Sequence, residues 1–491
     1  MDSGGDGECA VRTDHAGNGR TARPARTGRR RAARRERRAV YGEQERGAVH
    51  GEHGESADGE RRAIRGTGPA ARRRYRGAVA AAVATALALA LSGCGGSPQD
   101  VTLRLVAADY GGSDATSSRR YWDRVVAGYE SEHPGVTIDV TVHHWKVVDG
   151  EIAAMVKRGE APDIAQTASY AGHADRKRLY RADELLSIPT QADFLPGLAE
   201  GGKFQRVQYG LPFAADTRLL FWNKTLFAEA GLDGPPGSWP ELREAAEALR
   251  DAGVTIPYAL PLGPEEAQAE TAQWSLGAGG GLTDGVGAYT LDAPENVRAF
   301  QWLRDELVRP GLTGPGAPAA LDRQAAFDAF SRGEVGMVNG HPALIRQAAR
   351  NGVQFGTAPP PGREGPAETS VGVNDWLVAF RQNGHREEIG DFLDHVYSEP
   401  NMLEFADRHD MLPVTRSASG TMRAADRYQP LWDFLDRLPD SVHYPANKIT
   451  WNRVSGQLKE GIGQAVERGG DPAGILSRIQ RDAEATENAI H

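Results

Sequence analysis

The chain has 491 residues, which is long enough for two domains or more. Its composition, with 40% hydrophobic and 25% charged residues, is ordinary for a globular protein. The net charge is −9, and because arginine is concentrated in residues 1–76, the rest of the chain is strongly acidic. This acidity argues against a nucleic-acid partner.

Two segments of different character precede the main body of the chain. Residues 1–70 are rich in Arg, Gly, Ala and Glu without apolar periodicity, which predicts a disordered basic head or a translated stretch upstream of the true start codon. In residues 71–94, arginines precede the apolar run 78–91, which ends in Leu-Ser-Gly-Cys94 and resembles a bacterial lipobox. We therefore expect a signal peptide, and lipidation of Cys94 that anchors the protein to the outer face of the plasma membrane. The alternative is an Ala-rich buried helix that ends in Cys by chance.

The mature chain opens with alternating strand and helix patterns. Residues 101–107 and 136–142 predict strands, and a helix between them carries its apolar residues at helical spacing. A further helix and a strand at Ile164 follow. This alternation favours a parallel α/β sheet, whose ligands bind beyond the carboxyl ends of the strands. Asp109, Tyr110 and Tyr170 are therefore expected at the binding edge.

The most informative stretch is residues 209–250. It predicts a strand at 219–222, a short helix at 224–230 ended by a left-handed Gly231, and a long helix that begins with a capping box of Ser238 and Glu241. The strings Phe-Trp-Asn-Lys224 and Trp239-Pro-Glu-Leu resemble the bacterial extracellular solute-binding proteins, the carbohydrate-type receptors of ABC importers related to maltose-binding protein. The resemblance implies an α/β fold of the periplasmic-binding-protein type. Two lobes would form a clamp, each a doubly wound sheet flanked by helices, and this stretch would be the first crossover between them.

The remaining elements fit the same family. We expect a strand at 255–260, helices at 268–276, 296–307 and 319–332, a strand at 333–340, a return strand at 371–378, and helices at 450–468 and 471–488. The expected domains are residues 95–213 as the first part of lobe 1, 214–371 as the first part of lobe 2, 372–424 as the return to lobe 1, and 425–491 as C-terminal helices, mainly of lobe 2.

Sugars present hydroxyl edges and apolar C–H faces, which suit walls of aromatic rings and polar side chains. Together with the resemblance, this gives a list of ligand-binding candidates: Asp109, Tyr110, Tyr170, Asp216, Trp274, Asn374, Asp375, Trp376 and Trp451. Each has a structural alternative. Asp216 could be an exposed turn acid, the tyrosines could be exposed loop residues, and the three tryptophans could belong to the core.

The resemblance implies a cell-surface receptor that captures a sugar or oligosaccharide as a monomer and delivers it to the permease of an ABC transporter. Peptides or polyamines remain open as ligands. No cofactor or metal is expected, because the sequence contains no metal-ligand spacing, P-loop or nucleophile elbow. The alternatives are a surface carbohydrate hydrolase or lyase using acids such as Glu265 and Glu266, and a sensor lipoprotein.

Overall fold

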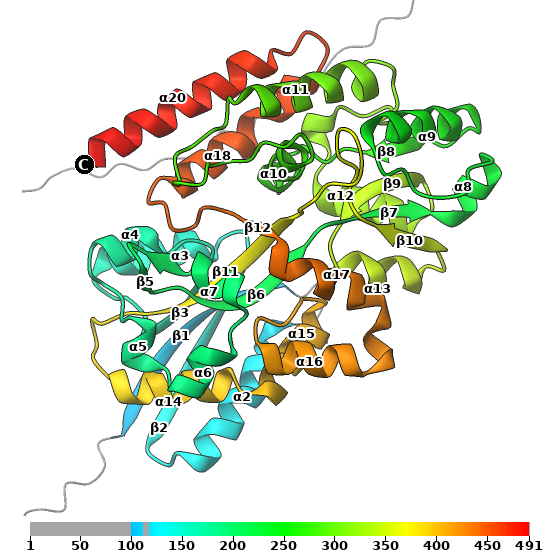
Figure 1. The fold of residues 1–491 in the computed structure, drawn as a ribbon. Coiled ribbons are helices and arrows are strands. Elements are labelled where there is room, and N and C mark those ends of the chain that lie inside the picture. The colour runs from blue at the N-terminus through cyan, green and yellow to red at the C-terminus, as the bar shows by residue number, and fades with distance from the viewer. Residues whose placement is uncertain (1–99, 111–116, 491) are drawn as a thin grey trace, which may run out of the picture. The chain divides into compact units, whose positions relative to one another are not determined.

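The strands of the protein form two main sheets in the computed structural model, which describes residues 100–110 and 117–490 (Figure 1). The basic head, the signal peptide and Cys94 lie outside the described residues. The first sheet has the order β12-β11-β3-β1-β2, with β6 also paired to β11. The second has the order β10-β7-β9-β8, and β4 and β5 form a small hairpin.

The strands of the first sheet are β1 (Val101–Asp109), β2 (Val136–His144), β3 (Ile164–Thr167), β6 (Leu211–Thr217), β11 (Val371–Ala379) and β12 (Val442–His443). The second sheet contains β7 (Leu219–Asn223), β8 (Ile256–Ala259), β9 (Val335–Gly340) and β10 (Phe355–Ala358), and the hairpin contains β4 (Lys203–Phe204) and β5 (Val207–Gln208). β1 runs parallel to β2 and β3, as the alternation of strands and helices predicts. β11 runs antiparallel to both β3 and β6.

Helices cover both sheets. Before β7 the chain forms α2 (Ser118–Glu132), α3 (Val148–Arg158), α4 (Ala171–Asp175), α5 (Ala182–Leu185), α6 (Ile188–Asp193) and α7 (Pro196–Gly201). Between β7 and β11 it forms α8 (Lys224–Glu229), α9 (Trp239–Asp251), α10 (Ala267–Gly277), α11 (Pro294–Trp302), α12 (Arg323–Ser331) and α13 (Ala343–Arg350). After β11 come α14 (Arg386–Val396), α15 (Glu399–His409), α16 (Arg416–Ala424), α17 (Trp432–Arg437), α18 (Trp451–Gly461), α19 (Gly463–Val466) and α20 (Pro472–Ile490). None of the helices in the described residues combines the length and the apolar character that a membrane span requires.

The local signals in residues 209–250 are confirmed. Gly231 ends α8 with a left-handed φ of 71°, a conformation that glycine adopts without strain. Ser238 and Glu241 form the predicted capping box at the start of α9. These contacts satisfy backbone N–H groups that the first turn of a helix leaves without partners, so α9 begins where the sequence places it.

The chain leaves β5 at Gln208, and after Tyr209 and Gly210 it forms β6, which runs without interruption from Leu211 to Thr217 and is buried throughout. Pro212 lacks a backbone N–H, but it lies opposite Trp376 where the β6–β11 register shifts. A proline is tolerated at such an irregularity because no ladder hydrogen bond is required of it. Asp216 is consequently a buried strand residue, and the alternative of an exposed turn acid is wrong.

Two segments that connect the sheets lie side by side. Residue 218 leads from β6 into β7, and residue 370 leads into β11. The Ser370 hydroxyl donates to the Arg218 carbonyl at 2.7 Å and accepts from the Arg218 N–H at 3.2 Å. The Thr217 hydroxyl donates to the Val371 carbonyl at 3.1 Å. The backbone between the two sheets is therefore held at a defined point, where residues from both sheets meet.

Candidate ligand-binding site

Polar side chains gather at the carboxyl ends of β1 and β3. The hydroxyl of Tyr110, which directly follows β1, donates to the carboxylate of Asp375 and accepts from the amide of Gln166. The Asp149 carboxylate, at the start of α3, accepts from the Thr167 hydroxyl at 2.6 Å. Burial, with a smaller contribution from the nearby charge of Asp149, raises the pKa of Asp375 to about 6, although the hydrogen bond from Tyr110 opposes the rise. This edge therefore holds two carboxyl groups whose ionised forms are poorly solvated.

A network of ion pairs begins at the crossover between the sheets. Arg218 is buried and binds Asp216 at 2.6 Å and Glu266 at 2.7 Å. Arg323, from α12, binds Glu266 at 2.6 Å and Glu265 at 3.0 Å. Each guanidinium thus has two carboxylate partners, which satisfies the need of a charge withdrawn from water to be paired.

The polar side chains at the carboxyl ends of β1 and β3 and the ion pairs at the crossover shift one another's pKa values. Burial raises the pKa of both Asp375 and the Tyr110 phenol. The charge of Glu266 adds to the rise at Asp375, and the charges of Asp375, Asp149 and Asp216 add to the rise at Tyr110. The Tyr444 phenol, half-buried after β12, also has its pKa raised, by burial and by the carboxylates around Arg218. We call the set the polar centre: Asp149, Asp216, Glu265, Glu266, Glu270 and Asp375, with Tyr110, Tyr444, Arg218 and Arg323.

Glu270 brings the polar centre into contact with the core of the second sheet. It is buried on α10, where it accepts from the Trp274 indole at 3.1 Å and from the Asn339 amide at 3.3 Å. Neither partner carries a charge, so burial dominates and raises the pKa of Glu270 to about 7. The carboxyl is therefore stabilised in its protonated form.

We expect Glu270 to make the protein less stable as the pH rises. Its carboxyl contributes stability that is complete below the pKa of an unfolded glutamate, about 4.3, and is lost as the pH rises through the folded pKa of about 7. Glu270→Gln should remove this slope, and it should raise the free energy of unfolding at mildly alkaline pH by on the order of 1–3 kcal/mol. Urea denaturation on both sides of this window measures the effect, with the exposed Glu229→Gln as control. A variant that loses stability at every pH would show that the charged form is the native one.

Four of the candidate residues lie in or directly after strands of the first sheet, but their contacts differ. They are Asp109, Tyr110, Asn374 and Asp375. Asp109 accepts from the Ser118 N–H at 2.9 Å and so holds the start of α2. Tyr110 and Asp375 bind each other, as described above. Asn374 is buried and its amide lies 3.1 Å from the Nδ1 of His443, while its Oδ1 has no partner among the described residues.

Tyr170 and Trp376 pack against each other and away from solvent. Their ring centroids are 5.4 Å apart, and the Tyr170 hydroxyl donates to the Gly201 carbonyl at 2.6 Å. Trp376 is 1% exposed, and its ring lies against the glycines Gly202 and Gly210, where an added Cβ would come within about 3 Å of it. The exposed-loop alternative for Tyr170 is wrong, and a ligand role for either ring stays a prediction.

The other two tryptophans lie in separate environments. Trp274 is 2% exposed and packs with Trp239 at 5.7 Å and Trp302 at 5.9 Å in the core of the second sheet. Trp451 begins α18 and packs on the ring of Tyr444 at 5.2 Å. Trp451 is therefore connected to the polar centre through Tyr444, and Trp274 through Glu270.

Several residues of the site were not singled out from the sequence. Arg218 and Asp149 are single charges within apolar or mixed segments, so no periodicity marks them. Trp145 is half-buried directly after β2, where its backbone N–H donates to the Asp109 carbonyl at 3.3 Å. The position of Trp145 in the sequence could have identified it, because it follows the carboxyl end of a parallel strand, as Tyr110 does.

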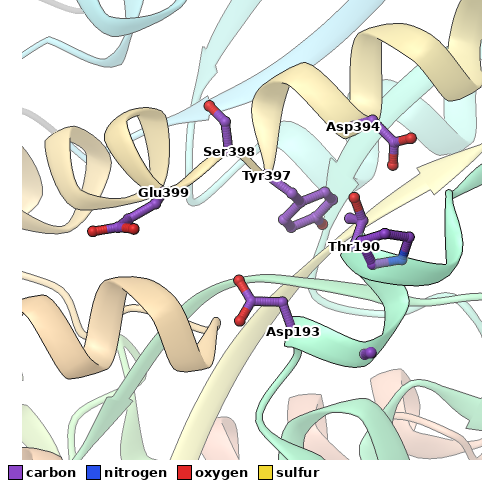
Figure 2. Close-up of a pocket in the computed structure, with 8 residues that line it drawn as sticks. Thr190, Asp193, Asp394, Tyr397, Ser398 and Glu399 are labelled. Atoms are coloured by element: carbon purple, nitrogen blue, oxygen red, sulfur yellow. The ribbon is translucent and has the colours of Figure 1, made fainter.

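A surface pocket of about 430 Å³ lies elsewhere, between α6 and the junction of α14 with α15 (Figure 2). Its carboxylates already have partners, since Asp193 accepts from the Ser417 N–H at 3.0 Å and Asp394 from the Ser187 N–H at 3.1 Å. None of its lining residues belongs to the polar centre. In the described part of the chain, no three His, Cys, Asp or Glu side chains are grouped as metal ligands.

The family model of the bacterial extracellular solute-binding proteins matches residues 113–403. A binding protein of Brucella abortus is 26% identical over 404 residues, which cover 79% of this chain and 93% of the relative. An uncharacterized lipoprotein of Streptomyces antibioticus is 26% identical over 346 residues, covering 67% of this chain and 74% of the relative. The sn-glycerol-3-phosphate-binding periplasmic protein of Rhizobium meliloti is 24% identical over 316 residues, covering 57% and 71%.

Solved structures agree in fold. The cyclic alpha-maltosyl-1,6-maltose binding protein of Arthrobacter globiformis aligns with a TM-score of 0.66 at 20% identity, over 78% of this chain and 98% of that one. A maltose-bound protein of T. maritima aligns with a TM-score of 0.67 at 17% identity, over 79% of this chain and 100% of that one. The chain therefore belongs to the family of bacterial extracellular solute-binding proteins and has their two-lobe α/β fold, which is that of transport binding proteins and not of enzymes.

Proposed function

We propose that the protein is the receptor of an ABC importer, that it binds a sugar or oligosaccharide at the polar centre, and that it delivers this ligand to a membrane permease. The observation that carries the proposal is the meeting of buried and half-buried carboxylates, guanidiniums and phenols from both sheets at the crossover. Charged and phenolic groups of this kind form strong hydrogen bonds with hydroxyl groups. The sugar-bound relatives in fold support the same ligand class.

The lobes proposed here are those expected from the sequence, with residues 95–213 and 372–424 in one lobe, and with residues 214–371 and most of 425–491 in the other. Lys146, after β2, lies 3.9 Å from Glu265 and would pair across the two lobes. A ligand bound to one lobe would gain contacts with the second on closure. This difference in affinity would shift the population to the closed form that docks on the permease.

The environment of Glu265 and Glu266 opposes the hydrolase alternative. Both bind Arg323, and Arg218 and Arg323 together hold the pKa of Glu266 below its usual value. A glycosidase needs one of its two carboxyl groups to be protonated as the general acid. Two ion-paired carboxylates do not meet this requirement, so these acids act as structural and binding groups.

Calorimetric titration of the full chain with mono- and oligosaccharides tests the function. We expect at least one oligosaccharide to bind with a dissociation constant in the micromolar range or below, which corresponds to about 8 kcal/mol. The sugar should be recovered unchanged after incubation with the protein. A product of hydrolysis or elimination would instead support the enzyme, and failure of every sugar to bind would reject the proposed ligand class.

We also propose that Cys94 is lipidated and anchors the receptor to the outer face of the plasma membrane. The lipobox-like string in the sequence supports this anchoring, as does the similar lipoprotein of Streptomyces antibioticus. Cys94→Ser removes the thiol that would carry the acyl chains, so the protein should move from the membrane fraction to the medium or the soluble fraction. Cys9→Ser is the matched control and should leave the distribution unchanged. Membrane retention of the Cys94→Ser variant would contradict the proposal.

A further inference from the structure

The polar centre contains more carboxyl groups than cations. Its six carboxyl groups are those of Asp149, Asp216, Glu265, Glu266, Glu270 and Asp375, and its two guanidiniums are those of Arg218 and Arg323. Two lysines add to the positive charge: Lys146, 3.9 Å from Glu265, and Lys459, whose charge acts on Asp149 and Glu266. Four cations therefore face six carboxyl groups.

Three of the six carboxyl groups have no cationic partner in the part of the chain that the structure describes. Among the described residues, Asp149, Asp375 and Glu270 form no ion pair, and their hydrogen bonds come from hydroxyls, amides, an indole and a backbone N–H. Burial raises the pKa of all three. A carboxylate that is withdrawn from water without a counter-ion is unfavourable, so a positive charge brought by a ligand would stabilise the site.

Buried amide atoms beside these carboxyl groups also lack partners. Asn339 is 3% exposed and its Nδ2 lies 3.3 Å from Glu270, but its Oδ1 is unpaired within the described residues. Gln273, also 3% exposed, uses its Oε1 to hold Ser370 and Val371, and its Nε2 has no partner in the same part of the chain. Buried polar groups without partners are uncommon in native proteins, and a hydroxylated ligand would satisfy them.

We propose that the ligand carries a protonated amino group beside its hydroxyl groups, and that the carboxylates of Asp149 and Asp375 bind this amino group. The inference rests on the function proposed above and names the ligand class as amino-substituted sugars. Asp149 and Asp375 are half-buried and keep some contact with solvent, whereas Glu270 is buried.

The same arrangement disfavours phosphorylated ligands. Phosphate recognition commonly uses arginine guanidiniums, but Arg218 and Arg323 each already bind two carboxylates. A phosphate would have to displace these carboxylates or lie beside Asp149 and Asp375. The site therefore differs in its ligand from what the name of the Rhizobium meliloti relative, an sn-glycerol-3-phosphate-binding protein, states for that protein.

Calorimetry with matched sugars tests the inference. The full chain is titrated near neutral pH with glucosamine, N-acetylglucosamine, glucose and glucose 6-phosphate, and with the β-1,4-linked trimers of the first three. The amine-bearing monomer or trimer should bind at least about tenfold more tightly than its N-acetylated counterpart, and glucose 6-phosphate should not bind. Equal or tighter binding of the acetylated or unsubstituted sugar would overturn the inference while leaving the sugar receptor in place, and so would binding of the phosphate. If no sugar of any charge binds, both proposals fall.

The Asp375→Asn variant tests whether the Asp375 carboxylate causes the preference for the amine-bearing sugar. The change removes the charge and keeps a hydrogen-bond acceptor for Tyr110, so the ratio of affinities between the amine and the acetylated sugar should fall towards one. Asp410→Asn is a matched control, because burial raises the pKa of Asp410 to about 6 as well, and its φ of 53° is one that asparagine tolerates. Asp410 lies beside Arg346, outside the polar centre, and its variant should keep the full ratio. An unchanged ratio in Asp375→Asn would overturn the assignment.

Discussion

Replacing Arg218 by methionine should lower the free energy of unfolding by about 3–5 kcal/mol near neutral pH. Methionine retains much of the apolar stem, so the loss comes from the charge. Asp216 would be left without its ion-pair partner, and Glu266 would retain only Arg323. A buried carboxylate without a partner must stay charged at a high cost or bind a proton, and either state is less stable than the ion pair.

Urea denaturation of the ligand-free protein measures this effect. Arg332→Met is the control, because Arg332 pairs with Glu334 at 2.8 Å on the exposed surface and its loss should have little effect. Combining Arg218→Met with Asp216→Asn should recover part of the loss, because the second change removes the uncompensated charge. A cost no larger than that of the control would mean that the guanidinium does not stabilise the crossover.

The importance of Arg218 could not be predicted from the sequence, and the reason is geometric. Arg218 lies between two buried strands, and neither helical nor strand periodicity marks a single charge in such a position. Its role depends on Glu266 and Ser370, which are distant in the chain and meet it only in the folded protein. Sequence patterns describe neighbours along the chain and leave such contacts out.

Local features, by contrast, could be predicted well. The alternation in β2 and the helical spacing of buried residues in α2 reflect burial on one face, which repeats along the chain. The cap of α9 depends on residues three positions apart, and it was found at the predicted place. β6 was not among the predicted strands. Its Pro212 shows why such a strand is hard to predict, because whether a strand tolerates proline depends on its partner strand and not on its own residues.

The aromatic candidates show a second limit. A tryptophan that stacks on a sugar and one that fills a core cannot be distinguished from the sequence alone. The sequence therefore indicated Trp274, Trp376 and Trp451 as candidates but could not determine their exposure. The structure buries all three and leaves Trp145 half-buried at the carboxyl end of β2. This contrast provides a direct comparison of two tryptophans in the first sheet.

Trp376→Ala should lower the free energy of unfolding of the ligand-free protein by about 3–5 kcal/mol, the usual loss when a large aromatic residue is removed from a core. The indole fills the space between Tyr170 and the glycines of residues 201–210, and side chains cannot move in from those glycines. The cavity would therefore remain open. Unfolding in urea measures the stability, and titration with the best-binding sugar measures the affinity of the folded fraction.

Trp145→Ala is the comparison that separates packing from binding. Trp145 is half-buried beside His144, with the Lys146 ammonium 5.4 Å from its ring, so its removal should cost less stability than the change at Trp376. If Trp145 contacts the ligand, its variant should lose at least about tenfold in affinity, or 1.4 kcal/mol. The opposite pattern, with Trp376→Ala stable but deficient in binding, would mean that the Trp376 ring faces the sugar. The packing of Trp376 against Tyr170 and glycine favours the first result, because a ring enclosed on these sides stabilises the protein before any ligand is present.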